Sequence, residues 1–250
     1  MSDTLMLNLR HQVMKQDDKG RNVWEQIVTP TEVEAGKVAI LVCDMWDDHT
    51  CKAAAIRVGR MVGRMNAVLN AARAKGAHII HGPNDCMDFY TGTPARLRML
   101  NAPHIQPPAP LAHDEPAKPI TDNNSSDSCH ADDKHFRAPW TRQHAALDID
   151  QDRDGISISG TEIYNYMQQH AITHYVLMGV HTNMCIMHRT FGVKQMVRWG
   201  VPTCVCRDLT DAMYNPEQPP YVSHDEGTGL IVGWIEKFWC PSIASTDLES

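Results

Sequence analysis

The amino-acid sequence predicts an α/β fold of three layers: a doubly wound, Rossmann-like and mostly parallel sheet of about five or six strands, with helices on both faces. Two observations predict it. Apolar runs typical of buried strands alternate with segments of helical periodicity. The loops between them are short, which calls for right-handed crossovers and parallel pairing. A chain of 250 residues, 42% of them apolar, can form one such core, so we expect a single domain over residues 1–250.

The first strand–helix–strand unit lies between residues 38 and 81. Residues 38–43, VAILVC, form a continuous apolar run rich in β-branched side chains, which predicts a strand buried on both faces. Residues 53–75 place apolar side chains at helical spacing, and Gly76 is a typical helix end. The next strand is expected at residues 77–81. Asp44 then follows the carboxyl end of the first strand.

An irregular insertion is expected at about residues 82–140, where prolines recur and a polar stretch follows them. It is too long for a simple connection. Two interpretations stay open: a surface excursion that contacts a second subunit, or a lid over the site.

Regular structure is expected again after the insertion. The pattern predicts strands at 145–149, 175–180 and 201–208 and helices at 161–169, 184–199 and 227–238. In such a fold the ligand binds at the carboxyl ends of the strands.

Composition excludes several classes of partner. Lys and Arg number 23 against 30 Asp and Glu, a net charge of −7 that is the wrong sign for binding nucleic acid. No apolar run approaches the length of a membrane span. The eight cysteines include no CxxC pair, so neither a zinc ribbon nor a disulfide framework is expected. We therefore expect a cytoplasmic protein with a small-molecule substrate.

Cys185 is the sharpest local feature. It lies where the strand ending near Gly179 gives way to a helix, and the unpaired N–H groups of a first helical turn favour a thiolate. A buried structural cysteine is the alternative. Asp44 ends a different strand of the same sheet, so both side chains should face one crevice. A carboxylate there can take the thiol proton and return it to a leaving amine.

These segments, VAILVCDMWDD, YVLMGVHTNMCI and RDLTDA, resemble the isochorismatase-like cysteine hydrolase superfamily, over roughly residues 37–81 and 145–240. The resemblance implies hydrolysis of a small amide or other C–N bond through a thioester. It implies Cys185 as nucleophile and Asp44 as general base and acid. The N–H groups of Cys185 and His181 would form an oxyanion hole, with a cis peptide between Val180 and His181.

The chain departs from the family at one catalytic position. The family lysine is expected nine residues before Thr161 of the ISGT segment, where this chain has Asp152. A cation must then come from Arg142, Arg153 or Lys134. We favour Arg142, because a guanidinium stays charged when partly buried. If none enters the crevice, a catalytically silent binding protein of the same fold is the alternative.

Further expectations concern the pocket and its partners. His181, Val180, Thr182 and Trp46 are expected to bind substrate. No metal and no cofactor are expected, because the Asp47–His49 segment is more typical of a polar loop that caps the following helix. The resemblance also implies a homo-oligomer. The isochorismatase branch hydrolyses a vinyl ether without a cysteine nucleophile, so Cys185 argues against that reaction.

Overall fold

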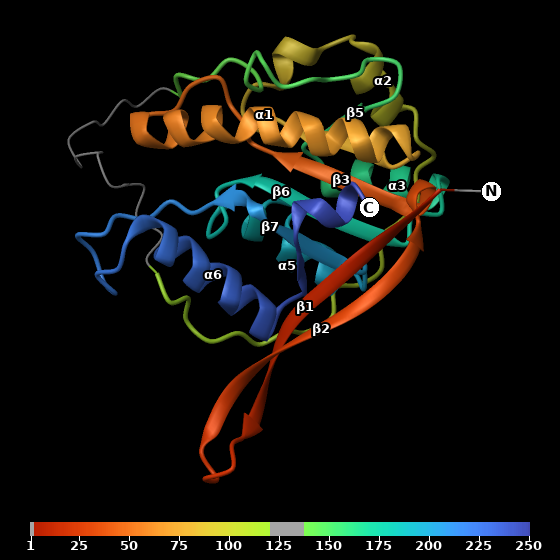
Figure 1. Cartoon of the computed structure of the whole chain (residues 1–250). Coiled ribbons are helices and arrows are strands. Elements are labelled where there is room, and N and C mark those ends of the chain that lie inside the picture. Colours follow the sequence, from red (N-terminus) through yellow and green to blue (C-terminus); the bar gives the residue numbers. More distant parts are fainter. Residues whose placement is uncertain (1–2, 121–137) are drawn as a thin grey trace.

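A mixed sheet of eight strands forms the centre of the computed structural model, which describes residues 3–120 and 138–250 (Figure 1). The strand order is β2-β1-β8-β7-β6-β3-β4-β5. The strands are β1 (Thr4–Gln16), β2 (Asn22–Glu34), β3 (Val38–Cys43), β4 (His78–Gly82), β5 (Gly155–Ile156), β6 (His174–Val180), β7 (Thr203–Asp211) and β8 (Ser242–Ile243). Every pairing from β8 to β5 is parallel. The predicted mostly parallel α/β sheet is confirmed, with more strands than expected.

Helices cover both faces of the sheet, which completes the three layers. The helix α1 (Lys52–Ala74) lies on one face, and α3 (Gly160–Gln169), α5 (Val193–Arg198) and α6 (His224–Phe238) lie on the other (Figure 1). Two shorter helices are α2 (Pro94–Leu100) and α4 (Cys185–His188). Strand β3 serves both cores, because successive side chains alternate in direction: Ile40 packs on the α1 side and Leu41 on the other.

Three segments differ from the sequence-based prediction. The single helix expected at 184–199 is two short helices, α4 and α5, because Arg189 is extended and Gly192 approaches the preceding turn. No strand forms at 145–149, and the insertion contains α2.

Six of the described cysteines are free, whereas Cys51 is disulfide-bonded.

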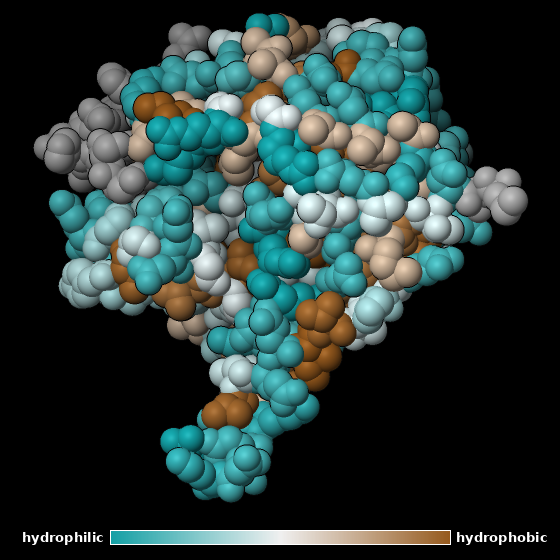
Figure 2. Space-filling view, viewed as in Figure 1, coloured by the Kyte–Doolittle hydropathy of each residue, from teal (hydrophilic) through white to brown (hydrophobic). Residues whose placement is uncertain are grey.

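A two-stranded ribbon, β1 and β2, was absent from the predicted elements. The strands pair in one antiparallel register from Thr4↔Glu34 to Gln16↔Asn22. Leu5 and Leu7 are buried in the core near its base. The distal part projects from the rest of the molecule, and Figure 2 shows it mostly hydrophilic with an apolar patch nearer the body.

The order of the strands reverses at β3, which places the switch point of the sheet at the carboxyl ends of β3 and β6. Strand β4 pairs with one side of β3 and β6 with the other. Cys43 at the end of β3 is level with Gly179 near the end of β6. Such a switch point is where ligands bind in doubly wound sheets. Within the described ranges, no helix is long and apolar enough to cross a membrane.

Candidate active site

Asp44 is a fully buried carboxylate directly after β3. Its backbone has a positive φ of 47°, and its amide donates to the Gly82 carbonyl at 3.1 Å. The backbone N–H of Asn84 donates to Asp44 Oδ1 at 2.8 Å. Burial raises the pKa of Asp44 to about 6, although the nearby Arg189 opposes that rise. Asp44 can therefore hold or release a proton near neutral pH, as a general base and acid requires.

Cys185 is the first residue of α4 and lies against Asp44. Its thiol makes a side-chain hydrogen bond with the Asp44 carboxylate and receives one from the backbone N–H of His181. Burial and the charge of Asp44 raise the pKa of Cys185 to about 12. The expectation that the helix start favours a thiolate is therefore wrong for the resting protein. Helix α4 has only four residues and offers little dipole to offset burial.

Arg189 supplies the cation of this site. It follows α4, four residues after Cys185, and its Nη2 lies 3.4 Å from Asp44 Oδ2. Arg189 was not among the residues selected from the sequence. A usable signal was present: residues four apart on a helical turn share a face. The family's lysine belongs to a different segment of the chain, near residue 152, so the resemblance does not point to Arg189.

The three cations considered from the sequence lie elsewhere or cannot be placed. The Arg142 guanidinium lies over the Phe89 ring, 5.2 Å from its centroid. Arg153 donates to the backbone carbonyl of Arg73. Lys134 lies outside the described residues. The structure thus pairs Asp44 with Arg189 rather than with Arg142.

The loop after β6 carries the predicted cis peptide, which the structure confirms between Val180 and His181. The N–H of Thr182 donates to the Asp211 carbonyl at 2.9 Å, and its hydroxyl lies 2.7 Å from that of Thr210. Thr182 therefore holds the loop against β7, and the buried Val180 side chain packs in the core on the α1 side. In the described part of the chain, no backbone carbonyl accepts from the N–H groups of His181 and Cys185. The N–H of His181 instead donates to the Cys185 thiol.

Four rings gather beside this loop. Trp46 stacks on Trp140 with centroids 4.2 Å apart, and His49 lies 5.3 Å from Trp140 and 5.2 Å from His181. Burial lowers the pKa of His49 to about 4 and that of His181 to about 3, so both are neutral at pH 7. The buried Nε2 of His181 and Nε1 of Trp140 have no hydrogen-bond partner among the described residues. Trp140, at the end of the insertion, was not predicted here.

The carboxylates of the acidic loop after Trp46 have hydrogen-bond and ion-pair partners within the protein. Asp47 accepts hydrogen bonds from the N–H and hydroxyl of Thr141, and Asp48 pairs with Lys52 of α1. His49 Nδ1 accepts from the N–H of Cys51, just before that helix. Among the described residues, no group of three or more His, Cys, Asp or Glu side chains could hold a metal ion.

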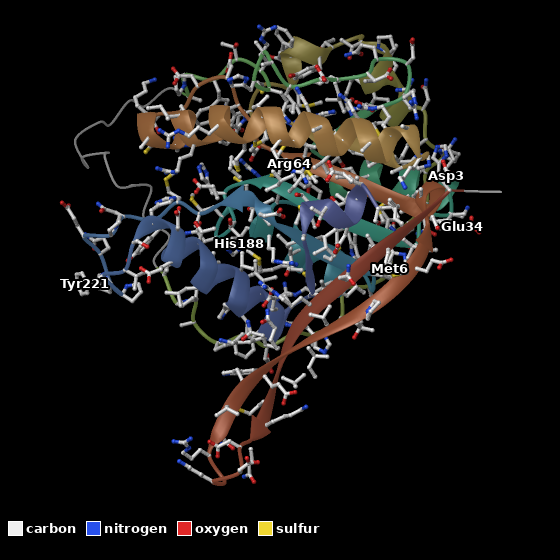
Figure 3. The ribbon with its side chains drawn as sticks, in the orientation of Figure 1. Asp3, Met6, Glu34, Arg64, His188 and Tyr221 are labelled. Atoms are coloured by element: carbon white, nitrogen blue, oxygen red, sulfur yellow. The ribbon has the colours of Figure 1, made fainter. Side chains whose placement is uncertain are left out.

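The insertion reaches the helix that carries the cysteine. Lys118 Nζ donates to the carbonyl of Asn183 at 3.0 Å and lies 3.1 Å from His188 Nε2. Figure 3 labels His188, the last residue of α4, between α1 above and α6 below. The insertion therefore contacts the site's own loop.

Comparisons with known proteins agree on the fold. No family model matches the sequence, and no curated protein matches it. Among solved structures, a cysteine hydrolase from Pseudomonas syringae pv. phaseolicola 1448A has a TM-score of 0.53 and 15% identity, covering 87% of this chain and 92% of that one. An isochorismatase from Pseudomonas putida KT2440 has a TM-score of 0.51 and 8% identity, covering 86% and 91%. The chain therefore has the fold shared by these two enzymes, as the resemblance in its sequence predicted.

Proposed function

We propose that the protein is a cysteine hydrolase that cleaves a small amide or related C–N bond through a thioester. The observation that carries the proposal is the cluster of Cys185, Asp44 and Arg189 at the switch point of the sheet. The Cys185 thiol is hydrogen-bonded to Asp44, and Arg189 lies 3.4 Å from the same carboxylate. Nucleophile, base and cation are the parts that acyl transfer to sulfur needs.

The first half of the reaction forms the thioester. Asp44 takes the Cys185 proton as the sulfur attacks the substrate carbonyl carbon. The N–H of His181 turns from the sulfur to the resulting oxyanion and stabilises it together with the N–H of Cys185. When the C–N bond breaks, the amine or ammonia leaves with the proton from Asp44. Because the resting thiol has a pKa of about 12, sulfur becomes nucleophilic only as this proton moves.

The second half returns the enzyme to its starting state. Asp44 removes a proton from water, which attacks the thioester carbonyl. The C–S bond breaks, the acid product leaves, and the Cys185 sulfur regains the proton from Asp44. The positive charge of Arg189 offsets negative charge on sulfur and on Asp44 during both halves. Trp46 and His181 line the substrate side of the crevice in this proposal.

The catalytically silent alternative loses its main support. It rests on the absence of the family lysine, and Arg189 places a cation on the same carboxylate. The expected role of Arg142 is therefore assigned to Arg189 in the proposed mechanism.

Intermediate trapping tests this function directly. The purified full chain is mixed with a panel of small amides, quenched in acid and analysed by peptide mass spectrometry. We expect an acyl adduct on Cys185 and turnover that Cys185→Ala abolishes. Cys86→Ala, which removes another buried thiol near the site, should retain turnover. Turnover by a folded Cys185→Ala protein would exclude the nucleophile assignment.

A further inference from the structure

Asp85 shares the Arg189 guanidinium with Asp44. The same Arg189 nitrogen, Nη2, lies 3.4 Å from Asp44 Oδ2 and 3.8 Å from Asp85 Oδ2. Asp44 is fully buried, whereas the Asp85 side chain is 57% exposed and that of Arg189 is 30% exposed. Asp85 therefore lies on the solvent side of Arg189, and Asp44 lies on the inner side.

The backbone around Asp85 is tied to the base. Asn84 donates its N–H to Asp44 Oδ1, and its carbonyl accepts from Trp46 Nε1 at 3.0 Å. Asp85 follows with a φ of 63°, a left-handed conformation that Asp and Asn tolerate better than most residues. The backbone next to Asp85 is thus tied to the base, and the Asp85 carboxylate lies beside the cation.

Charge at this point has a direct consequence for substrates. Two carboxylates share one guanidinium, so these three side chains carry a net charge of −1 when both acids are ionised. A substrate carboxylate approaching Cys185 would have to compete with Asp85 for Arg189 and would be repelled by it. An uncharged amide neither competes with Asp85 for Arg189 nor is repelled by the Asp85 charge.

We propose that Asp85 is a specificity-determining residue that restricts the site to uncharged carbonyl compounds, small amides without a carboxylate next to the reacting group. This inference rests on the proposed function, because it concerns the access of reactants to Cys185. It adds a substrate class to that function and assigns Asp85 a role in selection rather than in proton transfer.

A pair of alkylating reagents tests the charge effect without a known substrate. Iodoacetamide and iodoacetate form the same kind of S–C bond and release iodide, but only iodoacetate is an anion. The rate of each at Cys185 is measured by peptide mass spectrometry at about pH 8, and the ratio is normalised to that for glutathione. We expect the normalised ratio to favour iodoacetamide and to fall about fivefold in Asp85→Asn.

Asp88→Asn is the matched control. Asp88 is an exposed carboxylate three residues further on, and it has no ion pair within the described ranges. Its variant changes the net charge equally and should leave the ratio unchanged. An unchanged ratio in Asp85→Asn, an equal fall in both variants, or a wild-type preference for iodoacetate would overturn the inference. If neither reagent modifies Cys185, the proposed nucleophile fails instead, and the inference fails with it.

Discussion

Arg189 and Asp44 form an ion pair in which the cation comes from the residue directly after the nucleophile's own short helix. Their Nη2–Oδ2 distance is 3.4 Å, and Arg189 follows Cys185 by four residues. The base reaches them from a different strand, β3. Two of the three proposed catalytic groups are thus fixed by one local segment.

Removing the Arg189 charge should reduce turnover strongly. We expect Arg189→Gln to lower kcat by about a hundredfold or more, because sulfur and Asp44 lose their neighbouring positive charge. Arg189→Lys should recover part of that loss. Steady-state kinetics on the amide substrate found by trapping provides the measurement. Arg142→Gln is the matched control, since the Arg142 guanidinium lies over Phe89. A greater loss in Arg142→Gln than in Arg189→Gln would contradict this assignment.

The pH dependence of activity should report Asp44. Its pKa is raised to about 6 by burial, and only the ionised carboxylate can accept the thiol proton. We expect kcat/KM to fall about tenfold per pH unit below about pH 6. No alkaline limb from Cys185 is expected below about pH 10, because its thiol has a pKa of about 12. A pH–rate profile that stays flat down to pH 4 would rule out Asp44 as the base.

The same carboxylate should lower stability as it ionises. The Asp44 pKa is higher in the folded protein than the ordinary value of 3.8 expected in the unfolded chain, so the folded state binds the proton more tightly. Asp44 therefore contributes its full stabilisation below about pH 4. That contribution is lost as the pH rises through 6, which lowers the free energy of unfolding by about 3 kcal/mol. The Asp44→Asn variant has no ionisable group at position 44, so it does not lose stability in this way. Thermal melts should show its advantage over the wild type growing between pH 4 and pH 7, and parallel melting curves would contradict the prediction.

Gly179 should not tolerate a side chain. It has a φ of 104°, and a Cβ there would lie 2.1 Å from the backbone oxygen of Cys43. We expect Gly179→Ala to lower the free energy of unfolding by about 2 kcal/mol or more and to reduce activity, because β3 and β6 must move apart. The control is Gly63→Ala in α1, where nothing lies within 4 Å. It should raise stability by about 0.5–1 kcal/mol. Chemical denaturation of both variants measures the difference, and equal stabilities would disprove the clash.

The parts of the fold that the sequence predicts are those with strong local patterns. The buried run VAILVC and the apolar strand before Gly179 identify β3 and β6, and parallel pairing then brings Asp44 and Cys185 to one edge. The β1–β2 ribbon is harder to predict. Leu5 and Leu7 are buried at alternate positions, but the exposed Met6 between them is also apolar, and most of β2 is exposed and carries no apolar pattern.

Site residues beyond Asp44 and Cys185 depend on contacts that are distant in sequence. Asp85 comes from the loop after β4, and Trp140 comes from the end of the insertion. Neither position has a pattern of its own, because each gains its place from Arg189 or Trp46 only after folding. Arg189 is the exception, since its spacing from Cys185 is visible in the sequence.

Because Cys185 and Arg189 are only four residues apart, two of the three groups of the site move together, and Asp44 moves separately from them. Sulfur and guanidinium are attached to one rigid turn, whereas the carboxylate is attached to a neighbouring strand. Any slip between β3 and β6 would therefore move Asp44 away from both partners at once and leave the distance between sulfur and guanidinium unchanged. The pairing of Cys43 with Gly179 therefore sets the distance from Asp44 to the sulfur and to the guanidinium, and the proposed reaction depends on that distance.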